Sequence, residues 1–223
     1  MSAVETAPAT AVRLRITEIF ASLQGESTRV GLPTVFVRLT GCPLRCTWCD
    51  TSYSFTGGQA STVEAVLAEV GRHPARQVCV TGGEPLAQKA CLPLLSALCD
   101  AGYDVSLETS GALDIAGVDP RVARIMDLKA PDSGECARNL WANLTHLNAA
   151  DEIKIVIASR ADYDWAVGKV HEHALNQTCP VLFSAAQGSI APADLAAWIL
   201  EDGLPVRFQM QLHKILWGNQ QGR

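Results

Sequence analysis

Apolar runs of strand length alternate with segments of helical periodicity along most of this 223-residue chain. Short apolar runs bounded by turn residues are typical of buried strands, whereas longer amphipathic segments are typical of helices. The pattern predicts strands at residues 34–39, 77–81, 104–108, 124–128, 152–158, 180–184 and 206–211. It predicts helices at about 62–71, 88–101, 163–174 and 192–202, and one short helix within 131–147. Such alternation favours a parallel sheet built from repeated β-α units.

Two helix ends carry capping signals. Ser61 with Glu64 three residues later is a capping-box pattern, and Gly102 follows the second helix at the C′ position that glycine favours. No fixed-period repeat or linker divides the chain, so we expect one domain over 13–217, a flexible tail at 1–12 and a polar tail at 218–223. Because six or so β-α units are too few for a closed eight-stranded barrel, an open, partial (β/α)6 barrel fits the pattern.

Three cysteines in the run Gly41-Cys-Pro-Leu-Arg-Cys-Thr-Trp-Cys-Asp50 carry the most specific chemistry. The spacing of Cys42, Cys46 and Cys49 offers three thiolates to a cluster that needs four ligands, which leaves one iron open for a cofactor or substrate. A closed zinc site generally needs a second C-x2-C or H-x3-H pair, which the sequence lacks. A disulfide set fails because three cysteines this close cannot all pair. The motif therefore predicts an iron-sulfur cluster used in catalysis.

This motif resembles the signature of the radical S-adenosylmethionine superfamily, in which an aromatic residue commonly precedes the last cysteine, as Trp48 does here. A second motif, Thr81-Gly-Gly-Glu-Pro85, follows the apolar run Val78-Cys-Val80 and resembles the superfamily element that binds the cofactor's amino group. The resemblance implies a [4Fe-4S] cluster that binds S-adenosylmethionine and cleaves it reductively to a 5′-deoxyadenosyl radical.

Further blocks resemble the 7-carboxy-7-deazaguanine synthase family. They are Ile19-Phe-Ala-Ser-Leu-Gln-Gly-Glu26, Gly31-Leu-Pro-Thr-Val-Phe-Val-Arg-Leu-Thr-Gly41, Asp50-Thr51 and Gln209-Met-Gln-Leu-His-Lys-Ile-Leu-Trp217. The resemblance runs from about Ile16 to Trp217, nearly the whole chain. One departure is Ser27, where the family commonly has glycine, so a backbone that needs a positive φ there would have to accept serine.

Composition limits the possible partners and the cellular location of the protein. A 48% hydrophobic content is enough for a sizeable single core, and a net charge of -5 provides no basic field for a polyanion, so direct nucleic-acid binding is not expected. The start of the chain has no secretory pattern and no run reaches transmembrane length, so we expect no membrane association. The remaining cysteines are expected to be reduced, which favours a cytoplasmic location; they are Cys79, Cys91, Cys99, Cys136 and Cys179.

The candidate cofactor residues follow predicted strands, where parallel α/β folds build their sites. Gly82 and Gly83 allow close backbone approach to a ligand, and Glu84 offers an anionic partner for an ammonium group. With Trp48, these residues are expected to bind the cofactor. The ribose or carboxylate of the cofactor is expected to contact polar residues that follow later strands, which are Ser110, Asp127, Lys129 and Ser184. Two alternatives stay open: Lys129 could equally neutralise Asp127, and short polar residues at strand ends often cap backbone groups.

The resemblance also implies a substrate site, which consists of Leu23, Gln24, Gly25, Arg38, Thr81 and His213. A guanidinium such as that of Arg38 suits a carboxylate, and the Gln24 amide offers a donor and an acceptor to a pterin edge. Thr51 matches the family's Mg²⁺ site, and Asp50 is expected to assist indirectly. One protein ligand is enough, because Mg²⁺ keeps much of its hydration and uses substrate oxygens.

The reaction that the resemblance implies is ring contraction of 6-carboxy-5,6,7,8-tetrahydropterin to 7-carboxy-7-deazaguanine, with loss of ammonia, on the route to queuosine. It further implies an external electron donor such as flavodoxin, and a homodimer. Two alternatives remain open at this point: a radical activase that acts on a partner protein, and an iron-sulfur redox protein without a substrate. The second would have a fourth cluster ligand and no affinity for S-adenosylmethionine.

Overall fold

The computed structural model describes residues 13–218 and 220–222. Within them, a single nine-stranded sheet has the order β3-β1-β2-β4-β5-β6-β7-β8-β9. Seven of these strands run parallel: β2 (Pro33–Leu39), β4 (Gln77–Gly82), β5 (Asp104–Thr109), β6 (Ala123–Leu128), β7 (Glu152–Ile157), β8 (Val181–Ala185) and β9 (Arg207–Gln209). The predicted parallel α/β fold with an open sheet is therefore confirmed.

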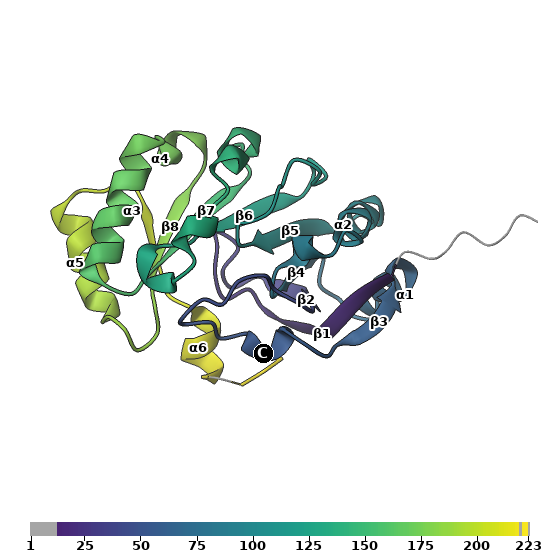
Figure 1. Cartoon of the computed structure of the whole chain (residues 1–223). Coiled ribbons are helices and arrows are strands. Elements are labelled where there is room, and N and C mark those ends of the chain that lie inside the picture. Colours follow the sequence, from purple (N-terminus) through teal and green to yellow (C-terminus); the bar gives the residue numbers. More distant parts are fainter. Residues whose placement is uncertain (1–12, 219, 223) are drawn as a thin grey trace, which may run out of the picture.

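Helices lie in four of the six connections between the parallel strands, whereas β5 to β6 is a loop and β6 to β7 contains only 3-10 turns. These helices are α1 (Val63–Val70), α2 (Cys91–Asp100), α3 (Arg160–Glu172), α4 (Leu175–Thr178) and α5 (Pro192–Glu201). In Figure 1 the sheet curves, with α1 and α2 beside one end and α3, α4 and α5 beside the other. A further helix, α6 (Leu212–Trp217), lies apart from these, near the C-terminal end of the chain.

Two strands that the pattern did not predict extend the sheet at one edge. β1 (Arg13–Leu23) pairs antiparallel with β2, and β3 (Gln59–Thr62) pairs antiparallel with β1. The register of β1 against β2 shifts between Ile16 and Glu18, where Thr17 forms an irregularity. A shift of this kind changes which side chains point to each face of a strand.

Three local predictions need correction. The segment expected to hold one short helix forms three 3-10 turns, η3 (Pro131–Ser133), η4 (Cys136–Arg138) and η5 (Trp141–His146). Strand β9 covers half of the expected 206–211, because α6 begins at Leu212. The first helix is capped by Thr62, whose side chain accepts from the Ala65 amide, and not by Ser61. Gly102 has the predicted left-handed conformation, with φ of 83°.

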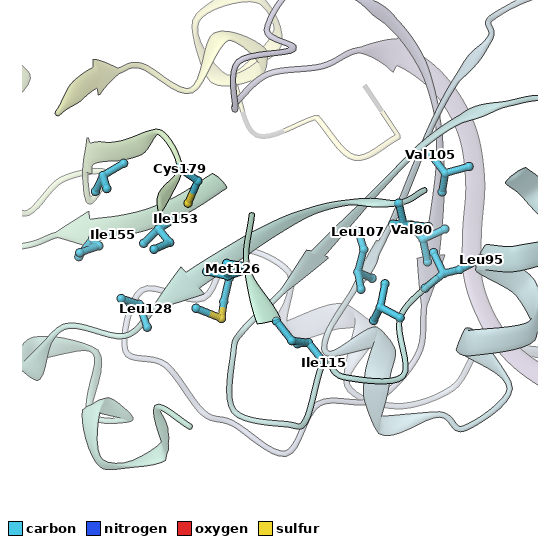
Figure 2. Packing of buried hydrophobic residues seen from close by; sticks show 14 of the residues in the cluster. Val80, Leu95, Val105, Leu107, Ile115, Met126, Leu128, Ile153, Ile155 and Cys179 are labelled. Atoms are coloured by element: carbon cyan, nitrogen blue, oxygen red, sulfur yellow. The ribbon is translucent and has the colours of Figure 1, made fainter. Parts of the chain in front are cut away.

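The core lies between the sheet and its helices. Figure 2 shows side chains of β4 to β7 packed together, including Val80, Leu107, Met126 and Ile155, with Leu95 of α2 against them. None of the eight cysteines forms a disulfide, and Cys79, Cys91 and Cys179 are buried. Burial raises the pKa of the Cys91 and Cys179 thiols to about 12, so they behave as small apolar side chains. Along the described ranges, no helix is long and apolar enough to span a bilayer.

Candidate active site

A cavity of about 640 Å³ opens where the parallel strands end. The loop after β2, the ends of β4 to β7 and the segment after β9 all contribute to its wall. Because carboxyl ends of parallel strands meet at one edge of a sheet, motifs far apart in sequence converge here. The wall includes these predicted site residues: Leu23, Gln24, Gly25, Arg38, Cys42, Cys46, Trp48, Cys49, Thr51, Thr81, Gly82, Gly83, Ser110, Asp127, Lys129 and His213.

The cysteine loop is anchored so that its three thiols face this cavity. Leu44, within the loop, is buried, and its amide donates to the Cys42 sulfur at 3.4 Å. The Arg45 side chain donates to the carbonyl oxygens of Cys42 and Leu44 at 2.8 and 2.6 Å. The Thr47 amide donates to Ser133 at 3.1 Å, which ties the loop to η3. These bonds fix the loop before any ligand binds.

The donor set fits an iron-sulfur cluster. All three cysteines are half-buried and free, and burial raises the pKa of the Cys42 and Cys46 thiols. Within residues 13–218 and 220–222, no three His, Cys, Asp or Glu side chains gather closely enough to hold a single metal ion. A cluster asks for less convergence, because each thiolate binds a different iron. Three soft ligands beside an open cavity therefore suit a cluster with one free iron.

The Gly82-Gly83 element packs directly against the cysteine loop. A Cβ atom at Gly83 would lie 2.4 Å from the Gly41 carbonyl oxygen and 2.7 Å from the Cys42 Cβ. One at Gly82 would lie 2.4 Å from the Leu39 carbonyl oxygen. Both glycines line the cavity, so their backbone groups are available to a ligand next to the cluster position.

Glu84 and Ser184 lie away from the wall of this cavity. The Glu84 side chain is fully buried and accepts from the Ser110 amide and hydroxyl, both at 2.6 Å, and from the Thr109 hydroxyl at 3.0 Å. Both carboxylate oxygens of Glu84 therefore already accept hydrogen bonds that join the loops after β4 and β5. In this structure neither oxygen is free to accept from an ammonium group, which is the contact that the sequence predicted. Ser184 is buried within β8 and does not reach the cavity surface.

Asp127 and Lys129 form an ion pair at 3.1 Å. In this structure Lys129 therefore neutralises Asp127, which was one of the two roles expected for it. Burial opposes the charge of Lys129, but the combined attraction of Asp127 and other neighbouring groups is greater and raises the pKa of the lysine. The second oxygen of Asp127, Oδ1, is buried and has no hydrogen-bond partner in the part of the chain described. A buried acceptor on a cavity residue suits a hydroxyl or amino group of a bound ligand.

The end of the cavity where the sequence motifs predict the substrate is formed by the loop after β1 and by the ends of β2, β4 and β5. The Arg38 guanidinium donates through Nε to Glu18 at 2.7 Å. The Thr81 hydroxyl donates to Glu108 at 2.8 Å, and the Gln24 amide reaches the same carboxylate at 3.4 Å. A cation, an anion and an amide therefore line this end of the cavity. Such a lining suits a planar heterocycle that carries a carboxylate.

The segment after β9 packs against the loop after β1 and completes the cavity wall there. Leu212 donates to the Gly25 carbonyl at 2.9 Å, and Gln211 donates to Glu26 at 2.5 Å. His213 packs so closely that a Cβ atom at Gly25 would lie 2.1 Å from its Nδ1. Burial lowers the pKa of His213, which favours the neutral imidazole at neutral pH. Gly25 thus permits the close approach of the C-terminal segment.

Thr51, the candidate Mg²⁺ ligand, lies at the end of the cysteine loop. Its hydroxyl is 3.7 Å from the Cys49 sulfur and its carbonyl accepts from the Ser54 amide and hydroxyl. Asp50 forms an ion pair with Lys214 at 2.8 Å, so it links this loop to α6. A neutral hydroxyl with no other protein oxygen ligand is a weak site by itself, and Mg²⁺ would depend on water and ligand oxygens.

Four charged residues of the cavity wall were not among the predicted site residues: Glu26, Glu108, Lys154 and Lys214. Lys154 donates to Glu26 at 2.6 Å and lies 3.4 Å from Asp127. Burial would raise the pKa of Glu26, but Lys154 and Gln211 outweigh it and lower the value to about 2. A signal was present in the sequence, because a lysine within the apolar strand Glu152–Ile157 cannot be buried without a partner.

Ser27 has the positive φ that the family's glycine suggests, at 68°. Its amide donates to the Gln209 side chain at 2.9 Å, and its hydroxyl accepts from the Arg29 amide at 3.1 Å. Serine is therefore tolerated in this conformation because local hydrogen bonds hold the loop.

Comparisons with known proteins agree with this geometry. A model of the radical SAM superfamily matches residues 36–132, which include the cysteine loop and the Gly82-Gly83 element. The 7-carboxy-7-deazaguanine synthase of Chlorobaculum tepidum is 48% identical over 207 residues, which cover 92% of this chain and 94% of that protein. Those of Koribacter versatilis and Thermoplasma acidophilum are 44% and 38% identical, covering 92% and 93% of this chain and 97% and 99% of their own.

Solved structures give the same result. QueE from Escherichia coli matches with a TM-score of 0.76 and 26% identity, covering 90% of this chain and 95% of that one. SuiB of Streptococcus suis bound to S-adenosylmethionine matches with a TM-score of 0.55 at 14% identity, covering 76% of this chain and 45% of that one, which supports the fold alone.

The partial barrel with three cavity-facing thiols and a glycine pair against them defines a radical SAM protein. Membership of that superfamily implies a [4Fe-4S] cluster and S-adenosylmethionine. Within it, the identity and coverage of the relatives show that the chain belongs to the 7-carboxy-7-deazaguanine synthase family. The resemblance inferred from the sequence motifs is confirmed.

Proposed function

We propose that this protein converts 6-carboxy-5,6,7,8-tetrahydropterin to 7-carboxy-7-deazaguanine, with loss of ammonia, as a radical SAM lyase of queuosine biosynthesis. The observation that carries the proposal is that one cavity joins the three cluster thiols to Gln24 and Arg38. A redox carrier has no use for these last two groups, and a radical activase would need room for a partner's polypeptide. The family relatives carry the name of this activity over nearly the full chain.

Cys42, Cys46 and Cys49 would hold the cluster, and Gly82, Gly83 and Trp48 would contact the cofactor beside it. The bound cofactor supplies the radical that abstracts a substrate hydrogen. The protein's own task is to hold the substrate C–H bond close to the cofactor and to exclude water. Ser110, Asp127 and Lys129 line the same wall and are proposed to contact the cofactor's ribose or carboxylate.

Glu84 enters this proposal as a support for the cofactor loop. Its carboxylate joins the loops after β4 and β5, so it would hold Gly83 and Ser110 in position rather than bind the ligand itself. Ser184 is buried in β8, and its part in cofactor binding would likewise be indirect.

At the substrate end, Arg38 would bind the carboxylate, and Leu23, Gln24, Gly25, Thr81 and His213 would surround the pterin ring. A neutral His213 could donate or accept a hydrogen bond, as the low pKa allows. Thr51 is proposed to bind Mg²⁺ together with the substrate carboxylate, where the ion would act as a Lewis acid and template. An external donor such as flavodoxin, a homodimeric assembly and a cytoplasmic location complete the proposal.

Anaerobic reconstitution tests the activity. The protein is loaded with iron and sulfide, then incubated with S-adenosylmethionine, reductant, Mg²⁺ and 6-carboxy-5,6,7,8-tetrahydropterin, and the products are identified by mass spectrometry. We expect 7-carboxy-7-deazaguanine from the wild type and none from Cys46→Ala. Cys136→Ala is the matched control, because Cys136 is also half-buried but does not line the cavity.

The pattern of products separates the alternatives. Formation of 5′-deoxyadenosine without 7-carboxy-7-deazaguanine would support the radical chemistry and show that the proposed substrate is wrong. Absence of both from a fully loaded cluster would favour the redox carrier. For Mg²⁺, we expect Thr51→Ala to lose the rate increase that added Mg²⁺ gives the wild type; equal Mg²⁺ dependence in the two proteins would remove Thr51 from the metal site.

A further inference from the structure

Glu18 makes the only hydrogen bond to the Arg38 guanidinium among the residues described. The Nε atom of Arg38 donates to Glu18 Oε1 at 2.7 Å, and the Tyr53 hydroxyl donates to the same oxygen at 2.7 Å. Both side chains of the ion pair are largely buried, with exposed fractions of 13% for Arg38 and 22% for Glu18. The two terminal nitrogens of Arg38 thus remain available at the cavity, which Arg38 lines.

The irregularity in β1 is what places Glu18 opposite Arg38. Ile16 pairs with Leu39, and the next paired residue of β1 is Glu18, which pairs with Arg38. Without the extra residue, Thr17 would stand opposite Arg38 and Glu18 would point to the other face. Bulges beside active sites commonly re-aim one side chain in this way.

Two aromatic rings fix the remaining freedom of the guanidinium. The Arg38 Cζ atom lies 5.9 Å from the ring centroid of Phe20 and 5.9 Å from that of Tyr53. Burial and the neighbouring Glu18 raise the pKa of Tyr53 to about 12, so the phenol stays protonated and donates to Glu18. The carboxylate is thereby fixed from its own side as well.

A second anion, Glu108, lines the same cavity and also lies near enough to attract Arg38. An arginine free to rotate would turn its terminal nitrogens toward Glu108 instead of an incoming ligand, since a guanidinium pairs most strongly through its two-nitrogen edge. Glu18 occupies Nε and so opposes that rotation.

We propose that Glu18 is a positioning residue, which holds the two-nitrogen edge of Arg38 toward the substrate carboxylate. The inference rests on the proposed function, in which Arg38 binds that carboxylate. It predicts that loss of Glu18 weakens recognition of the carboxylate specifically, while the pterin ring is still bound by the rest of the site.

The test compares the binding of two stable probes, 6-carboxypterin and pterin, to the reconstituted enzyme with S-adenosylmethionine. Glu18→Leu removes the acceptor, and Glu18→Gln keeps an acceptor without the charge. Glu69→Gln is the matched control, because the partly exposed Glu69 of α1 also pairs with an arginine, Arg72, but does not line the cavity. Because hydrogen bonds between charged groups are strong, we expect Glu18→Leu to weaken 6-carboxypterin binding about tenfold and pterin binding less than about twofold. The affinity of Glu18→Gln for 6-carboxypterin should lie between those of Glu18→Leu and the wild type.

A double-mutant cycle with Arg38→Gln completes the test. In the Arg38→Gln background, Glu18→Leu should cause no further loss of 6-carboxypterin binding, because its partner is already gone. Equal weakening of both probes, or independent effects of the two substitutions, would overturn the positioning role; Glu18→Gln supplies the comparison if Glu18→Leu folds poorly. If the wild type binds both probes equally, Arg38 is not a carboxylate site and the inference falls with it, whereas unchanged selectivity in Glu18→Leu rejects the inference alone.

Discussion

A methyl group at position 83 would collide with the loop that carries the cluster cysteines. The Cβ of an alanine there would lie 2.4 Å from the Gly41 oxygen and 2.7 Å from the Cys42 Cβ. Backbone atoms cannot rotate out of the way as a flexible side chain can, so the two loops must separate. Two hydrogen bonds cross the same junction, from the Gly83 amide to Leu39 at 3.3 Å and from the Glu84 amide to Gly41 at 2.8 Å. Separation stretches both.

The expected loss of stability follows from these contacts. Overpacking costs about 1–3 kcal/mol, and a weakened backbone hydrogen bond about 1 kcal/mol, so we expect Gly83→Ala to lower the free energy of unfolding by about 2–4 kcal/mol. For a domain of this size the melting temperature should fall by roughly 5–15 °C. Because displacing a reacting group by about 1 Å can cost on the order of 100-fold in rate, kcat/KM should fall by a similar factor.

Thermal unfolding followed by circular dichroism measures the packing, and product formation by the reconstituted enzyme measures the site. Gly168→Ala is the matched control, since Gly168 is exposed on α3 and a Cβ there meets nothing within 4 Å. Iron and sulfide content show whether the cluster still assembles. A Gly83→Ala protein that melts with the wild type and keeps its kcat/KM would refute the argument, because the two loops would then tolerate separation.

Three further predictions concern the rest of the chain. Gly168→Ala should itself stabilise the protein by about 0.5–1 kcal/mol, because alanine is the better helix former, and chemical denaturation measures this. Ser27→Gly should be more stable than Ser27→Ala by about 1 kcal/mol in the same assay, since both lose the hydroxyl bonded to Arg29 but only alanine bears the cost of the positive φ; equal stability would contradict it. Lys154 and Gln211 depress the pKa of Glu26 to about 2, so its contribution to stability is present above its ordinary value of 4.5 and is lost as the pH falls toward 2. Glu26→Gln should therefore weaken the pH dependence of the melting temperature between about pH 4.5 and 2. An unchanged dependence would show that the Glu26–Lys154 pair does not stabilise the protein in this way.

The parallel part of the fold could be predicted because each of its strands is an apolar run. Strand β1 could not, because its inward positions Leu14 and Ile16 lose their period of two at Thr17, where the register shifts. Strand β3, with the sequence Gln-Ala-Ser-Thr, has no apolar face to reveal it. These edge strands exist through pairing with a partner strand, and local periodicity does not record such pairing.

The candidate site divides in the same way. The three cysteines lie within one short loop, so their spacing alone indicates a cluster. The polar groups of the predicted substrate end come from five separate parts of the chain, and only the family resemblance brought Arg38 and His213 into consideration. Glu108 and Lys154 were missed because a charged residue on a strand is informative only when its burial and its partner are known.

Four charged groups of the cavity wall are paired with one another, and these pairs connect the elements that form the site. Glu26 holds Lys154, and Asp127 holds both Lys154 and Lys129, so four strands and loops are joined by buried charges. Removing one member would leave another charge buried and unpaired, a far larger penalty than the pair's net contribution. Within the described structure, Asp127 Oδ1 is the one buried unpaired side-chain atom that belongs to the cavity wall, and Arg38, which lines the same space, uses only its Nε in a hydrogen bond. Both groups belong to the cavity wall, so each is available to a ligand, the acceptor to a hydroxyl or amino group and the guanidinium to a carboxylate.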